Sequence, residues 1–114
     1  MITIISATNR PNGNTLKVAK NYALLMEKHH VHPLLLSLEQ LPHTIAFTDL
    51  YGKRSHEFDA IVSKYILPAK KFVFISPKYN GSFPGILKVF LDAIHPDINR
   101  NKKAALIGIV QIER

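Results

Sequence analysis

Cysteine is absent from this chain of 114 residues. Its absence excludes disulfides, thiolate metal sites and cysteine nucleophiles. The sequence also lacks any hydrophobic run near the ~20 residues that a membrane span needs. It has no basic start followed by an apolar stretch and a cleavage site, which a secretory signal would show. We therefore expect a soluble, cytoplasmic protein with no membrane association.

Acidic residues are scarce. The chain has 8 Asp and Glu against 15 Lys and Arg, which gives a formal net charge of +7. Such an excess attracts polyanions, including nucleic acids. The basic residues are spread along the chain in ones and twos, however, with no interleaving of basic and aromatic residues of the kind that binds single strands. We therefore expect no nucleic-acid site, and the charge favours a smaller, phosphorylated ligand.

The composition is that of a globular protein, with 46% hydrophobic and 20% charged residues. At this length it predicts one domain that spans residues 1–114. Short apolar runs predict strands at 2–6, 31–38, 72–76 and 104–110. Amphipathic segments predict helices at 15–30, 55–67 and 84–95, with Ser55 as the cap of the second. This alternation is typical of an α/β fold with a parallel sheet and helices on both faces.

Ligands of such sheets bind beyond the carboxyl ends of the strands, which directs attention to the loop at residues 7–14. The start of the next helix offers free N–H groups and partial positive charge to a phosphate. Arg10 can add a two-pronged contact, and Thr8 and Thr15 can add hydroxyl donors. The alternative is that Asn14 or Thr15 merely caps the helix and Arg10 lies on the surface. A glycine triplet and a Walker lysine are missing, which disfavours nicotinamide-type Rossmann and nucleoside-triphosphate sites.

A second loop follows the third strand at residues 77–83, with the sequence Pro-Lys-Tyr-Asn-Gly-Ser-Phe. Its proline and glycine make a stiff turn whose backbone can approach a flat ligand closely. The two loops together resemble those of the NADPH-dependent FMN reductase family, which includes quinone and azo-dye reductases. That family carries Ser/Thr-x-Arg-x-x-Ser-x-Asn/Thr after the first strand and Pro-Glu-Tyr-Asn-Gly-Ser-x-Pro-x-x-Leu-Lys after the third.

The resemblance implies a cofactor site for FMN, with the phosphate at the first loop and the flavin ring at the second. The residues expected to bind the cofactor are Thr8, Arg10, Asn14, Thr15, Pro77, Lys78, Tyr79, Asn80 and Gly81. No catalytic side chain and no metal ligand is expected, because the flavin itself would carry electrons from NADPH to a flavin, quinone or azo acceptor. Gly13 replaces the family's second serine, and Lys78 replaces its usual glutamate.

The resemblance also implies a flavodoxin-like, doubly wound sheet with strand order 2-1-3-4. We expect four strands, with the family's fifth strand and last helices missing, so that part of one sheet face is bare. The helix at 84–95 carries more apolar residues than are needed for one helix face packed against a sheet. This excess favours a homodimer, as the family forms, and the alternative is a helix buried within its own domain.

Two other classes of function stay open. The chain could be a truncated, non-catalytic member that binds flavin weakly or only oligomerises, or it could be a basic nucleic-acid-binding domain. The histidines at positions 29, 30 and 32 could suggest a metal site, but they lie at a predicted helix end, where imidazole complements the helix dipole.

Overall fold

The computed structural model describes residues 1–47, 49–51 and 54–110. Its strands form one sheet in the order β2-β1-β3-β4, and each neighbouring pair is parallel. The strands are β1 (Ile2–Ser6), β2 (Leu34–Ser37), β3 (Lys71–Pro77) and β4 (Lys103–Ile109), and the α-helices are α1 (Asn14–Lys28), α2 (His56–Ile61) and α3 (Gly85–Ala93). The predicted flavodoxin-like architecture and strand order are confirmed.

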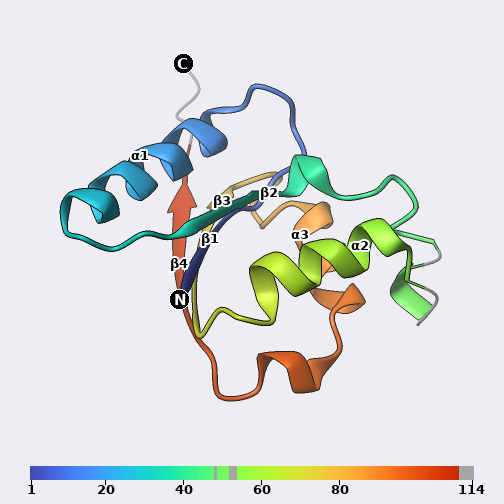
Figure 1. Cartoon of the computed structure of the whole chain (residues 1–114). Helices are drawn as coiled ribbons and strands as arrows, with labels where there is room; N and C mark the ends of the chain where they lie inside the picture. Colours follow the sequence, from blue (N-terminus) through green and yellow to red (C-terminus); the bar gives the residue numbers. More distant parts are fainter. Residues whose placement is uncertain (48, 52–53, 111–114) are drawn as a thin grey trace.

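The sheet is the middle of three layers, with α1 on one face and α2 and α3 on the other (Figure 1). Successive side chains of a strand point to opposite faces, so β1 sends Ile4 towards α1 and Ile5 towards α2 and α3. Both are fully buried. Between α2 and α3, the Phe58 and Phe90 rings meet edge to face with centroids 6.4 Å apart. Strand β1 is therefore covered by helices on both faces, as is usual for an inner strand of a parallel sheet.

The first helix and the second strand are shorter than predicted. Helix α1 ends at Lys28 because His30 has a left-handed φ of 63°, and the Val31 N–H turns back to the Met26 carbonyl. This is a common way to close a helix, although glycine is its usual residue. Strand β2 begins only at Leu34, after Pro33, which has no N–H to donate to a ladder.

The predicted cap of the second helix is confirmed, because the Phe58 N–H donates to the Ser55 hydroxyl over 3.2 Å. The predicted single helix at 55–67 is wrong in its second half. After Ile61 the chain forms a π-helical turn over Val62–Ile66. The Leu67 N–H donates five residues back to the Val62 carbonyl, which no periodicity in the sequence indicated.

Strands β3 and β4 differ from the predicted bounds by one residue at each end, and α3 is shorter than predicted. Pro84 precedes α3 in an extended conformation instead of forming its first turn. His95 begins a separate 3-10 turn, Pro96–Asn99, with its Nδ1 accepting the Asp97 N–H. Of the apolar residues of α3, Leu91 alone is classed as exposed, at 40%. The chain's own core thus buries most of the apolar surface that suggested a helix-mediated dimer.

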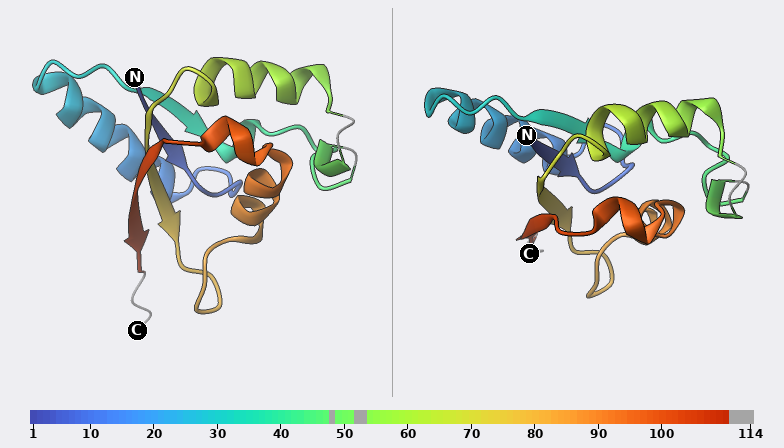
Figure 2. Two further views of the ribbon diagram at one scale, coloured as in Figure 1. Left: turned by 90° about the horizontal axis from the view of Figure 1, so that it is seen from below. Right: turned by 60° about the horizontal axis from the view of Figure 1, so that its bottom comes forward.

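The bare surface expected on the sheet lies at β4, the outer strand in Figure 2. Residues 103–106 are all exposed, and Leu106 in the middle of the strand is 74% exposed. At the start of β4, the Lys102 ammonium donates to the Ile66 carbonyl over 2.6 Å and lies 5.6 Å from the centre of the Phe72 ring. Burial there lowers the pKa of Lys102.

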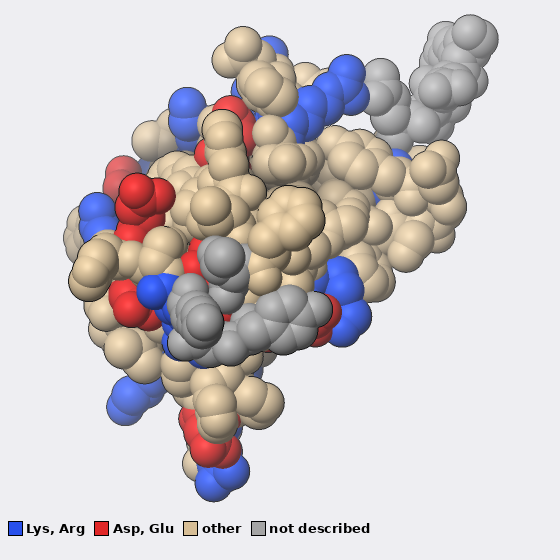
Figure 3. Space-filling model, turned by 90° about the vertical axis from the view of Figure 1, so that its right-hand side faces the viewer, with Lys and Arg blue, Asp and Glu red and all other residues tan. Residues whose placement is uncertain are grey.

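Charged side chains of both signs are interspersed on the face that Figure 3 shows, without a single basic block. The ion pairs among the described residues, such as Lys88 with Asp92, are exposed and local in sequence. Such pairs contribute little to stability. None of the described helices is long and apolar enough to cross a membrane.

A buried carboxylate organises the approach to α2. Asp49 is 1% exposed and accepts the Ser55 N–H over 2.5 Å, with the Ser55 and Thr44 hydroxyls each 3.4 Å away. Ser55 in turn caps α2. This contact was not predicted, because the segment at 43–54 has no clear sequence period.

We expect Asp49→Ala to lower the free energy of unfolding by about 2 kcal/mol, because the substitution leaves the Ser55 N–H without its acceptor. Urea denaturation followed by circular dichroism measures this loss. The matched control is Asp92→Ala, which removes an exposed ion pair and should cost about 0.5 kcal/mol or less. Equal losses in the two variants would contradict the organising role of Asp49.

Candidate functional site

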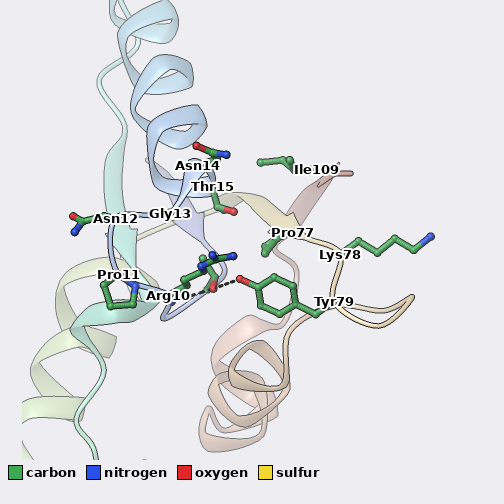
Figure 4. A pocket seen from close by; sticks show the side chains of 11 residues that line it. Arg10, Pro11, Asn12, Gly13, Asn14, Thr15, Pro77, Lys78, Tyr79 and Ile109 are labelled. Atoms are coloured by element: carbon green, nitrogen blue, oxygen red, sulfur yellow. Dashed lines mark hydrogen bonds between the residues drawn. The ribbon is translucent and has the colours of Figure 1, made fainter. Parts of the chain in front are cut away.

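Two loops meet beyond the carboxyl ends of β1 and β3. Because the strands are parallel neighbours, Ser6 lies in register with Ile75, and the chain leaves both strands on the same edge of the sheet. The loops and the start of α1 enclose a pocket of about 230 Å³ (Figure 4). The residues that line it are Thr8, Arg10, Pro11, Asn12, Gly13, Asn14, Thr15, Pro77, Lys78, Tyr79 and Ile109.

The start of α1 faces this pocket without a side-chain cap. Gly13 is the residue before the helix, in an extended conformation, and within the described part of the chain no side chain accepts the N–H groups of the first turn. The alternative in which Asn14 or Thr15 caps the helix is therefore wrong, whereas Arg10 does lie on the surface, as that alternative expected. The Thr15 side chain is buried and Asn14 is exposed. Free N–H groups and the helix dipole make such an end attractive to an anion.

A hydrogen bond joins the two loops across 71 residues of sequence. The Thr8 and Tyr79 hydroxyls are 3.0 Å apart, and Thr8 is only 2% exposed. The Thr8 hydroxyl also accepts the Arg10 N–H over 3.2 Å, so the same side chain shapes its own loop. Thr8 was predicted to bind the phosphate of FMN and Tyr79 to lie beside its flavin ring, and the contact places these two residues side by side.

Arg10 supplies positive charge to the pocket. Its side chain comes from the first loop and lies beside the Thr8–Tyr79 contact (Figure 4). Among the described residues no carboxylate pairs with it, and the lining contains no Asp or Glu. The guanidinium is thus available to an anionic ligand, and its planar fork suits phosphate oxygens.

The tip of the second loop has a structural reason for its Asn-Gly sequence. Tyr79 and Ser82 exchange N–H···O bonds of 2.7 and 2.9 Å across the turn. Asn80 and Gly81 between them have φ of 49° and 80°, which is the conformation that Asn-Gly adopts most readily in a tight hairpin. Neither residue lines the pocket. Of the nine predicted site residues, these two therefore lie at the loop tip, and the other seven are brought together.

Lys78 stands where the resembling family has glutamate, and its side chain extends away from the pocket (Figure 4). Its backbone belongs to the wall, because the Lys78 N–H donates to the Ile109 carbonyl over 3.1 Å. The residue contributes its main chain to the lining, and the charged end is exposed to solvent.

Sequence reasoning missed four lining residues. Pro11, Asn12 and Gly13 lie within the predicted loop, and a left-handed φ of 53° at Asn12 turns its backbone. Ile109 comes from β4, and it reaches the site because Pro77 and Ile109 are in register. The asparagine in a turn-rich loop was a usable signal for the first group. No local signal could have indicated Ile109.

We expect Tyr79→Phe to lower the free energy of unfolding by about 1 kcal/mol, because it removes the bond to Thr8 from a partly buried site. A double-mutant cycle with Thr8→Val, measured by urea denaturation, should give a coupling energy of similar size. The control is Tyr22→Phe, since the Tyr22 hydroxyl makes no hydrogen bond among the described residues. Additive losses in the cycle would show that the two hydroxyls do not interact.

Comparisons with known proteins agree with this fold. The structure of an NADH:FMN oxidoreductase in its apo form superimposes with a TM-score of 0.72 at 24% sequence identity, over 94% of this chain and 57% of that one. This chain thus spans a little over half of that protein's length. No curated protein sequence matches the chain. The family model for NADPH-dependent FMN reductase matches residues 1–113. The chain therefore belongs to the NADPH-dependent FMN reductase family.

Proposed function

We propose that this chain binds FMN in the pocket between its two loops and serves as an FMN-dependent oxidoreductase. Electrons would pass from NADPH or NADH to a flavin, quinone or azo acceptor. One observation carries the proposal: the uncapped start of α1 and the loop that contains Tyr79 line the same pocket. The hydrogen bond between Thr8 and Tyr79 holds the two loops together there. Family membership and the similarity to an NADH:FMN oxidoreductase support the same cofactor.

The donors on one side of the pocket fit a phosphate monoester. The free N–H groups at the start of α1, the hydroxyls of Thr8 and Thr15, and the Arg10 guanidinium are all donors. No acidic side chain in the lining opposes the charge of a phosphate. We assign Thr8, Arg10, Asn14 and Thr15 to this end of FMN.

The other side of the pocket suits a flat ring. Pro77, the Lys78 backbone and Tyr79 form one wall, and the apolar Ile109 stands beside them. The Asn80–Gly81 turn would position this wall without lining it. At about 230 Å³ the pocket is smaller than the roughly 300–1,000 Å³ of typical ligand sites. This size suits a cleft that holds the phosphate end and leaves much of the ring accessible to a second reactant.

The bound flavin would supply the redox chemistry, because it can accept a hydride and pass electrons on. The residues of the chain would bind and orient it, and no general acid or base is required of them. A second candidate function is flavin binding without turnover. The small volume of the pocket, about 230 Å³, favours keeping this candidate, because typical ligand sites measure roughly 300–1,000 Å³. FMN-dependent oxidation of NADPH or NADH, followed at 340 nm, separates the two, since only the first consumes the nicotinamide.

We expect Arg10→Gln to weaken FMN binding by about tenfold or more, because a charge-assisted hydrogen bond to phosphate contributes roughly 1.5–3 kcal/mol. Quenching of flavin fluorescence measures the dissociation constant. Riboflavin, which has no phosphate, should bind both proteins equally. Lys17→Gln is the matched control, since Lys17 is exposed on α1 and does not line the pocket. Equal weakening for FMN and riboflavin would place the phosphate elsewhere, and no quenching with the unsubstituted protein would reject the proposal.

Gly13→Ser should tighten FMN binding about tenfold or more, since a hydroxyl that donates to the charged phosphate contributes about 1.5–3 kcal/mol. The position accommodates the change, because an added Cβ would lie 3.5 Å from the nearest atom, the Arg10 carbonyl oxygen, and the backbone is extended. The same fluorescence titration with FMN and riboflavin measures the effect. A gain for both ligands would mean that the hydroxyl does not reach the phosphate.

A further inference from the structure

A second cavity lies at the same edge of the sheet as the pocket between the loops, beyond the end of β2. Its volume is about 300 Å³, and it is lined by the segment at 38–46, by Asn9 of the first loop and by Ile86 at the start of α3. Asn9 is followed directly by Arg10, which lines the pocket between the loops. Adjacent residues of the first loop therefore line the two cavities. None of the described residues around the second cavity comes from β4.

The second cavity differs from the first in its charge. Its lining includes the carboxylate of Glu39 and, among the described residues, no Lys or Arg. Glu39 is exposed and forms no ion pair within the described part of the chain. Its backbone is fixed at the end of β2, because the Glu39 N–H donates to the Ser37 hydroxyl over 3.2 Å. Such a cavity favours a ligand group that donates hydrogen bonds and disfavours an anion.

The rest of the lining suits a flat ring of low polarity. Leu41 and Ile45 are buried and Ile86 is half-buried, so these side chains supply an apolar wall. Phe47 directly follows the lining residue Ala46 and is 76% exposed, the largest exposed fraction among the described large hydrophobic side chains. An exposed aromatic ring is a stacking partner for a nucleobase. The second cavity thus offers an apolar wall, an adjacent aromatic ring and one hydrogen-bond acceptor with negative charge.

We propose that this cavity binds the adenosine end of the nicotinamide donor, and that Glu39 makes NADH the preferred donor over NADPH. The inference rests on the proposed function, because it names one substrate of that reaction. The adenosine ribose of NADH has a 2′-hydroxyl, which can donate a hydrogen bond to a carboxylate. NADPH has a phosphate in its place, which a carboxylate repels. An acidic residue binds the same hydroxyl in dinucleotide sites of other α/β sheets.

This placement leaves the pocket between the loops to FMN. The pyrophosphate of the donor would cross the first loop at Asn9, whose side-chain amide can donate to a phosphate oxygen. The nicotinamide end would continue towards Tyr79, because the Thr8–Tyr79 hydrogen bond holds the second loop beside the first. The preference for NADH departs from the donor in the family's name, which is NADPH.

Binding of ADP-ribose and of its 2′-phosphate to the flavin-free chain tests the proposal without a redox reaction. Isothermal titration calorimetry should give ADP-ribose a dissociation constant about tenfold or more below that of the 2′-phosphate, because the phosphate replaces a hydrogen bond to a charged group with repulsion. Glu39→Gln should remove most of this preference, and Glu39→Arg should invert it. Glu27→Gln is the matched control, since Glu27 is exposed on α1 and does not line the cavity.

Backbone amide chemical shifts locate the bound nucleotide. ADP-ribose should shift the amides of Asn9 and of residues 38–46, whereas FMN should act mainly on those at 10–15 and 78–79. Phe47→Ala should weaken the binding of ADP-ribose and of its 2′-phosphate alike, by about fivefold or more, because stacking on the base does not depend on the ribose substituent. Circular dichroism verifies that each variant is folded.

Three results would overturn the proposal. These are no binding of either nucleotide, a preference that Glu39→Gln leaves unchanged, and ADP-ribose shifts confined to the amides at 10–15 and 78–79. Failure of the proposed function is distinguishable from all three. It appears as an absence of FMN fluorescence quenching while ADP-ribose still binds at residues 38–46 with its dependence on Glu39.

Discussion

The parallel pairing of β1 with β3 is the constraint on which the rest of the structure depends. It aligns Ser6 with Ile75, and the ladder continues into the first loop through the bond from the Ala7 N–H to the Ile75 carbonyl. Because parallel strands end on the same edge, segments some seventy residues apart emerge side by side. The position of the pocket and the Thr8–Tyr79 contact both follow from this alignment. A sheet with another strand order would separate them.

The same sheet is protected unequally from its centre to its edge. Helices cover both faces of β1, where Ile4 and Ile5 are fully buried, whereas β4 is largely exposed. The end and the middle of strand β4 therefore have different surroundings. Its end contributes Ile109 to the pocket, and its middle presents Leu106 to solvent.

Local rules predicted those features that depend on neighbouring residues. The apolar runs indicated the strands, Ser55 was correctly predicted as a cap, and the family motif located both loops. Local rules failed where distant contacts compete with periodicity. The π-helical turn at 62–66 interrupts a regular apolar stripe, and the Thr3 hydroxyl of β1 bonds to the Tyr65 carbonyl within it. The large number of apolar residues in α3 was likewise ambiguous. Composition does not say whether such residues are buried within the same chain or against a second copy.

Residue types and their spacing were sufficient to predict the α/β class and the two loops with their donors, and the family resemblance supplied the strand order. Only the tertiary structure decided that the start of α1 is uncapped, that Tyr79 meets Thr8, and that Asn80 and Gly81 form a turn outside the pocket. It also decided that Ile109 joins the site. The physical reason is register. Residue types and spacing specify what each segment can do, whereas the pairing of strands sets which atoms come within hydrogen-bonding distance.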